Sequence, residues 1–302
     1  MSYKIKTKHQ SKNGKKILAG TVSAVVAFAL IFIVLSPPDV IPCNKGSLAD
    51  CGCPSSKSDI SSKNLLLIDV TDPIRATKVG DLKSLVAEGI AGEEAFWEWL
   101  MNGKRVSKTS LYLITNQPPA DTKPLAVFCS APPKISQFFS NSSFKDIRIA
   151  QSESTRKVED TLLKLTQNGT SARSPIIESL ATYTSNASAW SKNGTLTLAS
   201  DLLENSDECG FFEHKTSIPE FSKTTFAVGC QSKLETMTAN LGDYPTIALC
   251  KLPGKGDKPG LTEFWRGLFQ GTTQLDVVMT CDWNEIKRRQ RDVLALKKNV
   301  GR

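Results

Sequence analysis

The sequence predicts an α/β protein with a doubly wound, mostly parallel sheet and helices on both faces, preceded by one N-terminal transmembrane helix. Two observations lead to this class. From residue 64 onward, short and nearly continuous apolar runs alternate with longer amphipathic segments, which is typical of buried parallel strands joined by helical crossovers. An uncharged, mostly apolar run at 17–36 precedes them and has the length that a helix needs to cross a bilayer.

The charges around the apolar run predict its orientation. Six lysines and no acidic residue lie within 1–16, whereas 36–60 contain two lysines and three aspartates. The positive-inside rule therefore places the N-terminus in the cytoplasm and the main domain on the periplasmic or extracellular side of the inner (plasma) membrane. A cleaved signal peptide is the alternative, but it requires a shorter apolar region and small residues at a cleavage site, and Pro37 and Pro38 follow here instead.

The chain divides into five parts on composition. A basic cytoplasmic tail at 1–16 precedes the transmembrane helix, and a stalk rich in Pro, Ser, Gly and Cys follows it. The predicted parts are the tail 1–16, the helix 17–36, the stalk 37–63, an α/β domain 64–283 and a basic C-terminal tail 284–302. The length of the fourth part is suitable for one large domain.

Each element of the domain is predicted from its pattern. Apolar runs of strand length begin at Leu65 and recur five more times, and the segments between them show helical spacing of apolar residues. The predicted strands are 65–70, 110–115, 125–130, 195–202, 246–252 and 275–280. The predicted helices are 78–100, 154–167, 262–271 and one that starts after Ser174, where Pro175 is suited to a first turn. Residues 209–223 have no clear period and are predicted to form a loop insertion.

The net charge of +8 does not indicate a nucleic-acid partner. Residues 1–16 carry +6 and residues 284–302 carry +5, so the rest of the chain has a net charge of −3. A mildly acidic body offers no continuous surface for phosphates, and membrane topology already explains the basic N-terminus. The C-terminal stretch has a helix-like pattern. It can be interpreted either as a solvated tail or as a segment that contacts acidic lipid or a partner.

All eight cysteines lie beyond the apolar run, at 43, 51, 53, 129, 209, 230, 250 and 281. An even set on the outer side predicts disulfides in an oxidising compartment. Zinc ligation is the alternative, but Cys51 and Cys53 are separated by one residue, where zinc sites usually have two to four. The sequence does not fix the connectivity. One pairing, Cys209 with Cys230, would join the ends of the loop insertion.

Polar residues end several of the predicted strands, at the sheet edge where ligands gather in doubly wound folds. The first strand continues into Asp69 and Thr71, a later loop ends in Ser174 before a helix, and the strand from Thr195 runs into Asp201. Each residue also has a purely structural explanation, since Ser174 suits a helix N-cap and the aspartates can form turns with their own backbone.

These residues resemble, in order and spacing, the motifs of the von Willebrand factor A domain across about 64–283. The resemblance implies a metal-ion-dependent adhesion site for Mg²⁺ or Mn²⁺, with Asp69, Thr71, Ser174 and Asp201 as ligands. The family pattern begins Asp-x-Ser-x-Ser, and Pro73 stands where its second hydroxyl belongs. Two carboxylates and two hydroxyls with several waters still suit magnesium, which needs about six oxygen ligands.

The resemblance implies a membrane-anchored protein-binding module of an envelope assembly rather than an enzyme. Its partner would be another envelope protein, of unknown identity. A metal-free scaffold of the same fold is the first alternative. The second is a phosphatase, because the strand ending in Asp69 and Thr71 also resembles the first motif of haloacid-dehalogenase-like phosphotransferases, although no paired acid ends a later strand. A Ser-His-Asp hydrolase would have to use His214, in the irregular insertion, without a nucleophile elbow.

Overall fold

The structure is a computed structural model. It describes residues 53, 57, 60–71, 85, 106–115, 124–130, 152, 155–156, 158–164, 173–185, 194–206, 209, 228–241, 246–252, 260–270 and 276–300. Within these residues no helix has the length and apolar character required to span a bilayer, and the predicted transmembrane helix at 17–36 lies outside them.

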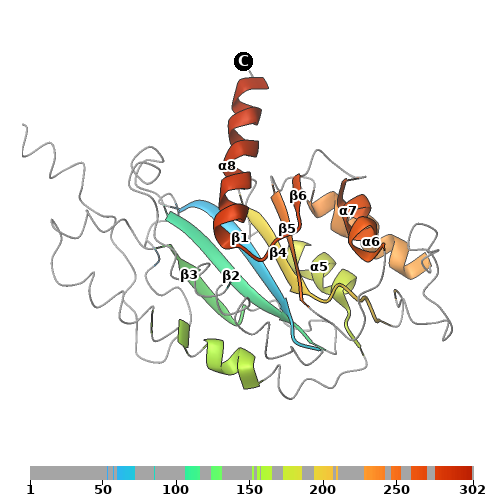
Figure 1. Ribbon diagram of the computed structural model, residues 1–302. Coiled ribbons are helices and arrows are strands. Elements are labelled where there is room, and N and C mark those ends of the chain that lie inside the picture. The colour runs from blue at the N-terminus through green and yellow to red at the C-terminus, as the bar shows by residue number, and fades with distance from the viewer. Residues whose placement is uncertain are drawn as a thin grey trace, which may run out of the picture.

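A six-stranded mixed sheet forms the centre of the fold, in the order β3-β2-β1-β4-β5-β6 (Figure 1). The strands are β1 Ile60–Asp69, β2 Val106–Ile114, β3 Ala126–Cys129, β4 Thr195–Ser200, β5 Thr246–Lys251 and β6 Asp276–Val278. All neighbouring pairs are parallel except β2 and β3, which are antiparallel. The prediction of a mostly parallel α/β sheet is therefore confirmed, with one antiparallel edge strand.

The first strand starts earlier than predicted. β1 begins at Ile60, inside the segment that the sequence assigned to the stalk. Polar partners explain why these residues join the sheet: the Ser62 hydroxyl donates to the Ser107 hydroxyl, and Asn64 accepts a hydrogen bond from the Thr195 amide. Since polar residues carry no apolar periodicity, their pairing could not be predicted from the pattern.

Alternate residues of the strands face two separate hydrophobic clusters. Leu65 and Leu67 of β1 pack with the helices α5 and α7, whereas Leu66 and Ile68 pack with α8 on the opposite face. Side chains of a strand alternate between faces, so a central strand in a covered sheet has to be apolar on both. This requirement produces the uninterrupted apolar run in the sequence.

Four helices have assigned bounds: α5 Ile176–Ser185, α6 Val228–Leu241, α7 Leu261–Gln270 and α8 Trp283–Val300. The prediction of helices after Ser174 and at 262–271 is confirmed. Described residues between 155 and 164 are also helical, as predicted for 154–167. Of the predicted helix at 78–100 the structure describes Leu85, which is helical and buried. The helix α6 was not predicted.

Three disulfides connect described parts of the chain, and all six of these cysteines are buried or partly buried. They join Cys53 to Cys129, Cys209 to Cys230, and Cys250 to Cys281. The predicted use of cysteines for disulfides, including the Cys209–Cys230 pairing, is confirmed for these positions. Cys43 and Cys51 lie outside the described residues. The first bond fixes part of the predicted stalk to β3, so that residue 53 belongs to the folded body.

Candidate binding site at the carboxyl edge of the sheet

The parallel strands β1 and β4 are neighbours in the sheet and end together. Their register pairs Ile68 with Ala199, so the next residues, Asp69 and Ser200, lie opposite each other at the carboxyl edge. The helix α5 begins close to the same edge and packs on the face that also carries Leu65 and Leu67. Asp69 has the same parity as these leucines, and its side chain therefore lies on the side of the sheet where α5 starts.

The Asp69 carboxylate is the centre of a cluster of three hydroxyl groups. Oδ1 accepts hydrogen bonds from the amide and the hydroxyl of Thr71, at 3.0 and 2.6 Å. Oδ2 accepts hydrogen bonds from the hydroxyls of Ser174 and Ser200, at 2.6 and 2.8 Å. Asp69 is only 5% exposed, and the three hydroxyl residues are buried as well. Segments that are far apart in the sequence thus meet at one buried carboxylate, and we call Asp69, Thr71, Ser174 and Ser200 the Asp69 cluster.

Three of the four predicted metal ligands belong to this cluster, and the fourth lies beside it. Asp69, Thr71 and Ser174 are directly hydrogen-bonded, as described above. Asp201 follows Ser200 in the chain and is at the same edge of the sheet, where its Oδ1 accepts a hydrogen bond from the Leu203 amide at 2.9 Å. Pro73, the departure from the family pattern, lies outside the described residues.

Ser200 is a member of the cluster that the sequence analysis missed. The pairing register of β1 and β4 is the information that would have identified it. In a parallel pair, residues opposite each other place their side chains on the same face, and Asp69 lies opposite Ser200, whereas Asp201 has the other parity. Ser200 also accepts a hydrogen bond from the Leu202 amide at 2.9 Å, so its hydroxyl orders the loop that follows β4 as well.

The loop at 201–206 holds the start of α5 in place. Ser174 and Asn205 exchange two backbone hydrogen bonds, at 2.8 and 2.9 Å. Leu202 has a φ of 66°, in the left-handed region that is uncommon for residues other than glycine. Its carbonyl accepts a hydrogen bond from the Trp265 indole of α7 at 2.8 Å, which helps to fix this conformation. Backbone strain of this kind persists only where the surroundings determine it, and it is concentrated at functional sites.

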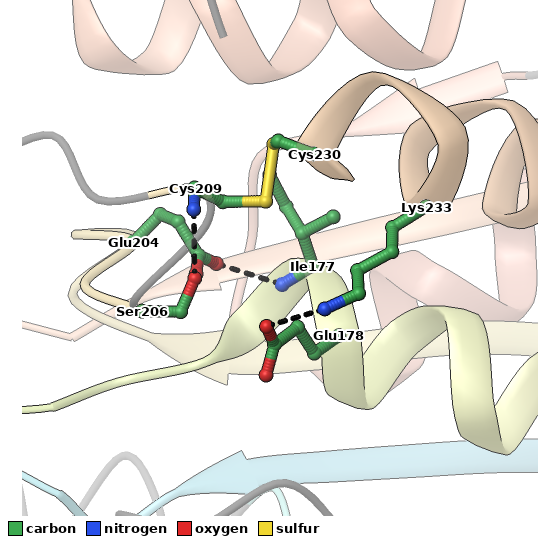
Figure 2. Close-up of a disulfide and its surroundings, with 7 residues drawn as sticks. All are labelled: Ile177, Glu178, Glu204, Ser206, Cys209, Cys230 and Lys233. Carbon is green, nitrogen blue, oxygen red and sulfur yellow. Dashed lines mark hydrogen bonds and ion pairs between the residues drawn. A yellow bond between two sulfur atoms is a disulfide. The ribbon is translucent and has the colours of Figure 1, made fainter. Parts of the chain in front are cut away.

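Glu204 in the same loop has no exposed surface, and its side chain lies at the amino end of α5 (Figure 2). Its Oε2 accepts a hydrogen bond from the Ile177 amide at 2.7 Å. A carboxyl group from elsewhere in the chain thus accepts a hydrogen bond from one of the first amides of α5, which have no partner within the helix. Beside it, Glu178 forms an ion pair of 2.7 Å with Lys233 of α6, and the Cys209–Cys230 disulfide joins the end of the loop to α6.

The surroundings of Glu204 change its acidity. Burial raises the pKa of Glu204 to about 8 from an ordinary value of 4.5, and the neighbouring charge of Glu178 acts in the same direction. Hydrogen bonding from the Ile177 amide and with Ser206 opposes the shift. At neutral pH this carboxyl group is therefore mostly protonated in the folded protein. Glu204 was not among the residues predicted from the sequence, because a buried glutamate carries no sequence signature that distinguishes it from an exposed one.

The donor set of the Asp69 cluster fits a hard cation. The side-chain atoms that hydrogen-bond to the Asp69 carboxylate are all hydroxyl oxygens. Oxygens are the ligands that magnesium prefers. Among the residues that the structure describes, no group of three or more His, Cys, Asp or Glu side chains is arranged to hold a metal ion. A cation at this edge would be held by the Asp69 carboxylate and hydroxyls of the cluster, with Asp201, waters or a partner's groups as further ligands.

No protein-family model and no curated protein sequence matches the chain. Among solved structures, the chain has a TM-score of 0.33 to the crystal structure of the human COPII-coat protein Sec24c, with 11% sequence identity. That alignment covers 80% of this chain and 32% of the other, so the chain spans about a third of the length of Sec24c. A similarity at this level supports no conclusion about fold family or function.

Proposed function

We propose that the protein is a membrane-anchored, extracytoplasmic protein-binding module whose Asp69 cluster holds a divalent cation, Mg²⁺ or Mn²⁺. The observation that carries the proposal is the convergence of three hydroxyls from three separate segments on one buried carboxylate. The resemblance of these positions to a von Willebrand factor A adhesion site agrees with it. The partner is another protein of an envelope assembly, which binds through an exposed carboxylate.

The orientation of the hydroxyl protons supports cation binding. A hydroxyl has one proton to donate and two lone pairs with which it can accept. In Thr71 and Ser174 the proton is donated to Asp69, so the lone pairs point elsewhere and present electron-rich oxygens. Asp69 thus has the role of orienting the hydroxyls and of supplying negative charge. When bound, the cation supplies the positive charge that attracts a carboxylate of the partner.

The disulfides support the proposed location. Disulfides persist in oxidising compartments, and the three that join described residues all lie on the C-terminal side of the predicted span at 17–36. The lysines before that span favour a cytoplasmic N-terminus. Together they favour a single-pass protein of the plasma membrane, with its α/β domain in the periplasm or outside the cell.

A metal-free scaffold is the second candidate, and one observation favours it. The four hydrogen bonds to Asp69 use both carboxylate oxygens twice, which is about the full accepting capacity of a carboxylate. In that case the cluster has a purely structural role, because its hydrogen bonds join β1, β4 and the start of α5. The two candidates differ in their dependence on divalent ions.

Partner capture distinguishes the two candidates. The full chain, used as bait with solubilised membranes in the presence of Mg²⁺, is expected to retain a partner that a chelator releases. The Ser174→Ala bait should capture roughly tenfold less, because one hydroxyl ligand and its orienting hydrogen bond are lost. The control is Ser185→Ala, which makes the same substitution at the exposed end of α5. Equal capture with Mg²⁺, with chelator and with both variants would contradict a cation-dependent mechanism.

A further inference from the structure

Among the described residues of the C-terminal helix α8, those of the first turns pack on the sheet. Trp283 and Ile286 are buried in the cluster on the face of the sheet opposite α5 and α7, and the helix contacts β5 and β6. Asp282 caps the helix, since its Oδ1 accepts hydrogen bonds from the amides of Asn284 and Glu285 at 2.9 and 3.4 Å. The amino end of α8 is therefore fixed to the domain in a defined direction.

Beyond these turns α8 leaves the sheet. Figure 1 shows its C-terminal part extending away from the other labelled helices and strands. The side chains of Arg288, Arg289, Arg291 and Leu296 are exposed there, and Leu296 is 64% exposed. The segment 284–302 contains seven basic and two acidic residues. The projecting part of the helix thus combines concentrated positive charge with an exposed leucine.

The charges along α8 only partly balance one another. Lys287 and Arg288 precede Arg291 by four and three residues and repel it, whereas Asp292 attracts Arg288 and Arg289 at the same spacings. The ion pair between Arg288 and Glu285 is 3.8 Å long and exposed, so its contribution is small. Without packing, isolated helices of this length are only marginally stable in water. A surface of negative charge would remove the repulsion and stabilise the projecting turns.

We infer that α8 is an arm that binds the surface of an anionic lipid bilayer. Basic side chains on a helix that also presents apolar residues are the features with which a helix binds at a headgroup layer. Val293 and Leu296 follow Ile286 by seven and ten residues, so they continue the apolar side of the helix past the domain. An acidic protein would satisfy the charges, but it gives no reason for the exposed Leu296 that directly precedes Lys297 and Lys298. This inference does not depend on the Asp69 cluster.

Hydrogen–deuterium exchange of the full chain tests the inference. The protein is mixed with nanodiscs of zwitterionic lipid, or with nanodiscs that also contain about one-third anionic phosphatidylglycerol. Amides of Arg289–Val300 are expected to exchange roughly tenfold more slowly with the anionic discs, and high salt should abolish the difference. The readout is local to α8, so it does not depend on how residues 17–36 interact with the lipid.

Two variants and one control identify the contacts. The double variant Arg288→Gln/Arg289→Gln should bind anionic lipid roughly 30-fold more weakly, because each basic residue near such a surface raises the affinity roughly fivefold. Leu296→Gln should also lose much of the protection, since it removes the apolar contact without changing the charge. Arg156→Gln removes an exposed positive charge from another part of the domain and should leave the protection unchanged.

Two outcomes would overturn the inference. One is equal exchange of the α8 amides with both kinds of disc. The other is protection by a soluble acidic polypeptide, polyglutamate, to the same extent as by anionic discs, with no effect of Leu296→Gln. That second result would assign α8 to an acidic protein partner instead.

Discussion

The Asp69→Asn variant is expected to lose roughly 4 kcal/mol of unfolding free energy in the presence of chelator, where no cation contributes. The carboxylate accepts four hydrogen bonds in a buried position. An amide of the same shape has only one accepting oxygen, and its nitrogen would face either the Thr71 hydroxyl or the two serines. At least one buried group would then lose its partner. Urea unfolding followed by circular dichroism measures the loss.

The matched control is Asp201→Asn, the same substitution at the neighbouring strand end. Asp201 is partly exposed, and the amide oxygen of asparagine can still accept the hydrogen bond from Leu203. A loss of about 1 kcal/mol or less is expected there. If the two variants were equally stable, the Asp69 cluster would not hold β1, β4 and α5 together as its geometry implies.

Glu204→Gln is expected to change how stability depends on pH. Burial raises the pKa of Glu204 to about 8, so the folded protein keeps the proton while the unfolded chain releases it near pH 4.5. Below pH 4.5 both states are protonated and the group contributes no pH dependence. Between pH 4.5 and 8 the unfolded state binds fewer protons, so stability falls as pH rises, by roughly 5 kcal/mol in total. Above pH 8 both states are ionised and the effect is constant.

Glutamine cannot ionise, and its amide oxygen can still accept the hydrogen bond from Ile177. The variant should therefore lack this fall, and it should become more stable than the wild type toward pH 8. Urea unfolding at several pH values from 5 to 8 measures the difference between the two profiles. Glu263→Gln makes the same substitution at an exposed position of α7 and should follow the wild-type profile. Parallel profiles for the wild type and Glu204→Gln would contradict the assigned acidity.

The parts of the fold that depend on apolar pattern were predictable, and those that depend on polar pairing were not. The apolar run from Leu65 to Ile68 predicts a strand that is buried on both faces, as these residues are in the structure. The direction of β3 is set by pairing with β2, which no periodicity encodes. The helix α6 buries Cys230, Leu234 and Met237 at helical spacing, but its other positions are largely polar. Three apolar residues beside an irregular segment gave too little signal.

The candidate site follows the same division. Asp69, Thr71 and Ser174 could be predicted because each ends a strand or starts a helix at the same edge of the sheet. Ser200 required the register of β1 against β4, which depends on the three-dimensional pairing. Glu204 required the position of its loop over the start of α5, which depends on the two backbone hydrogen bonds between Ser174 and Asn205. Burial of a polar side chain is a property of tertiary structure, and composition does not reveal it.

Titration of the metal-free protein with Mn²⁺, followed by electron paramagnetic resonance of the free ion, measures cation binding by the Asp69 cluster. We expect saturable binding of one ion per chain, competition by Mg²⁺, and affinity roughly tenfold weaker in Ser174→Ala but unchanged in Ser185→Ala. Absence of saturable binding to the folded wild type at millimolar Mn²⁺, or equal binding by both serine variants, would contradict this expectation.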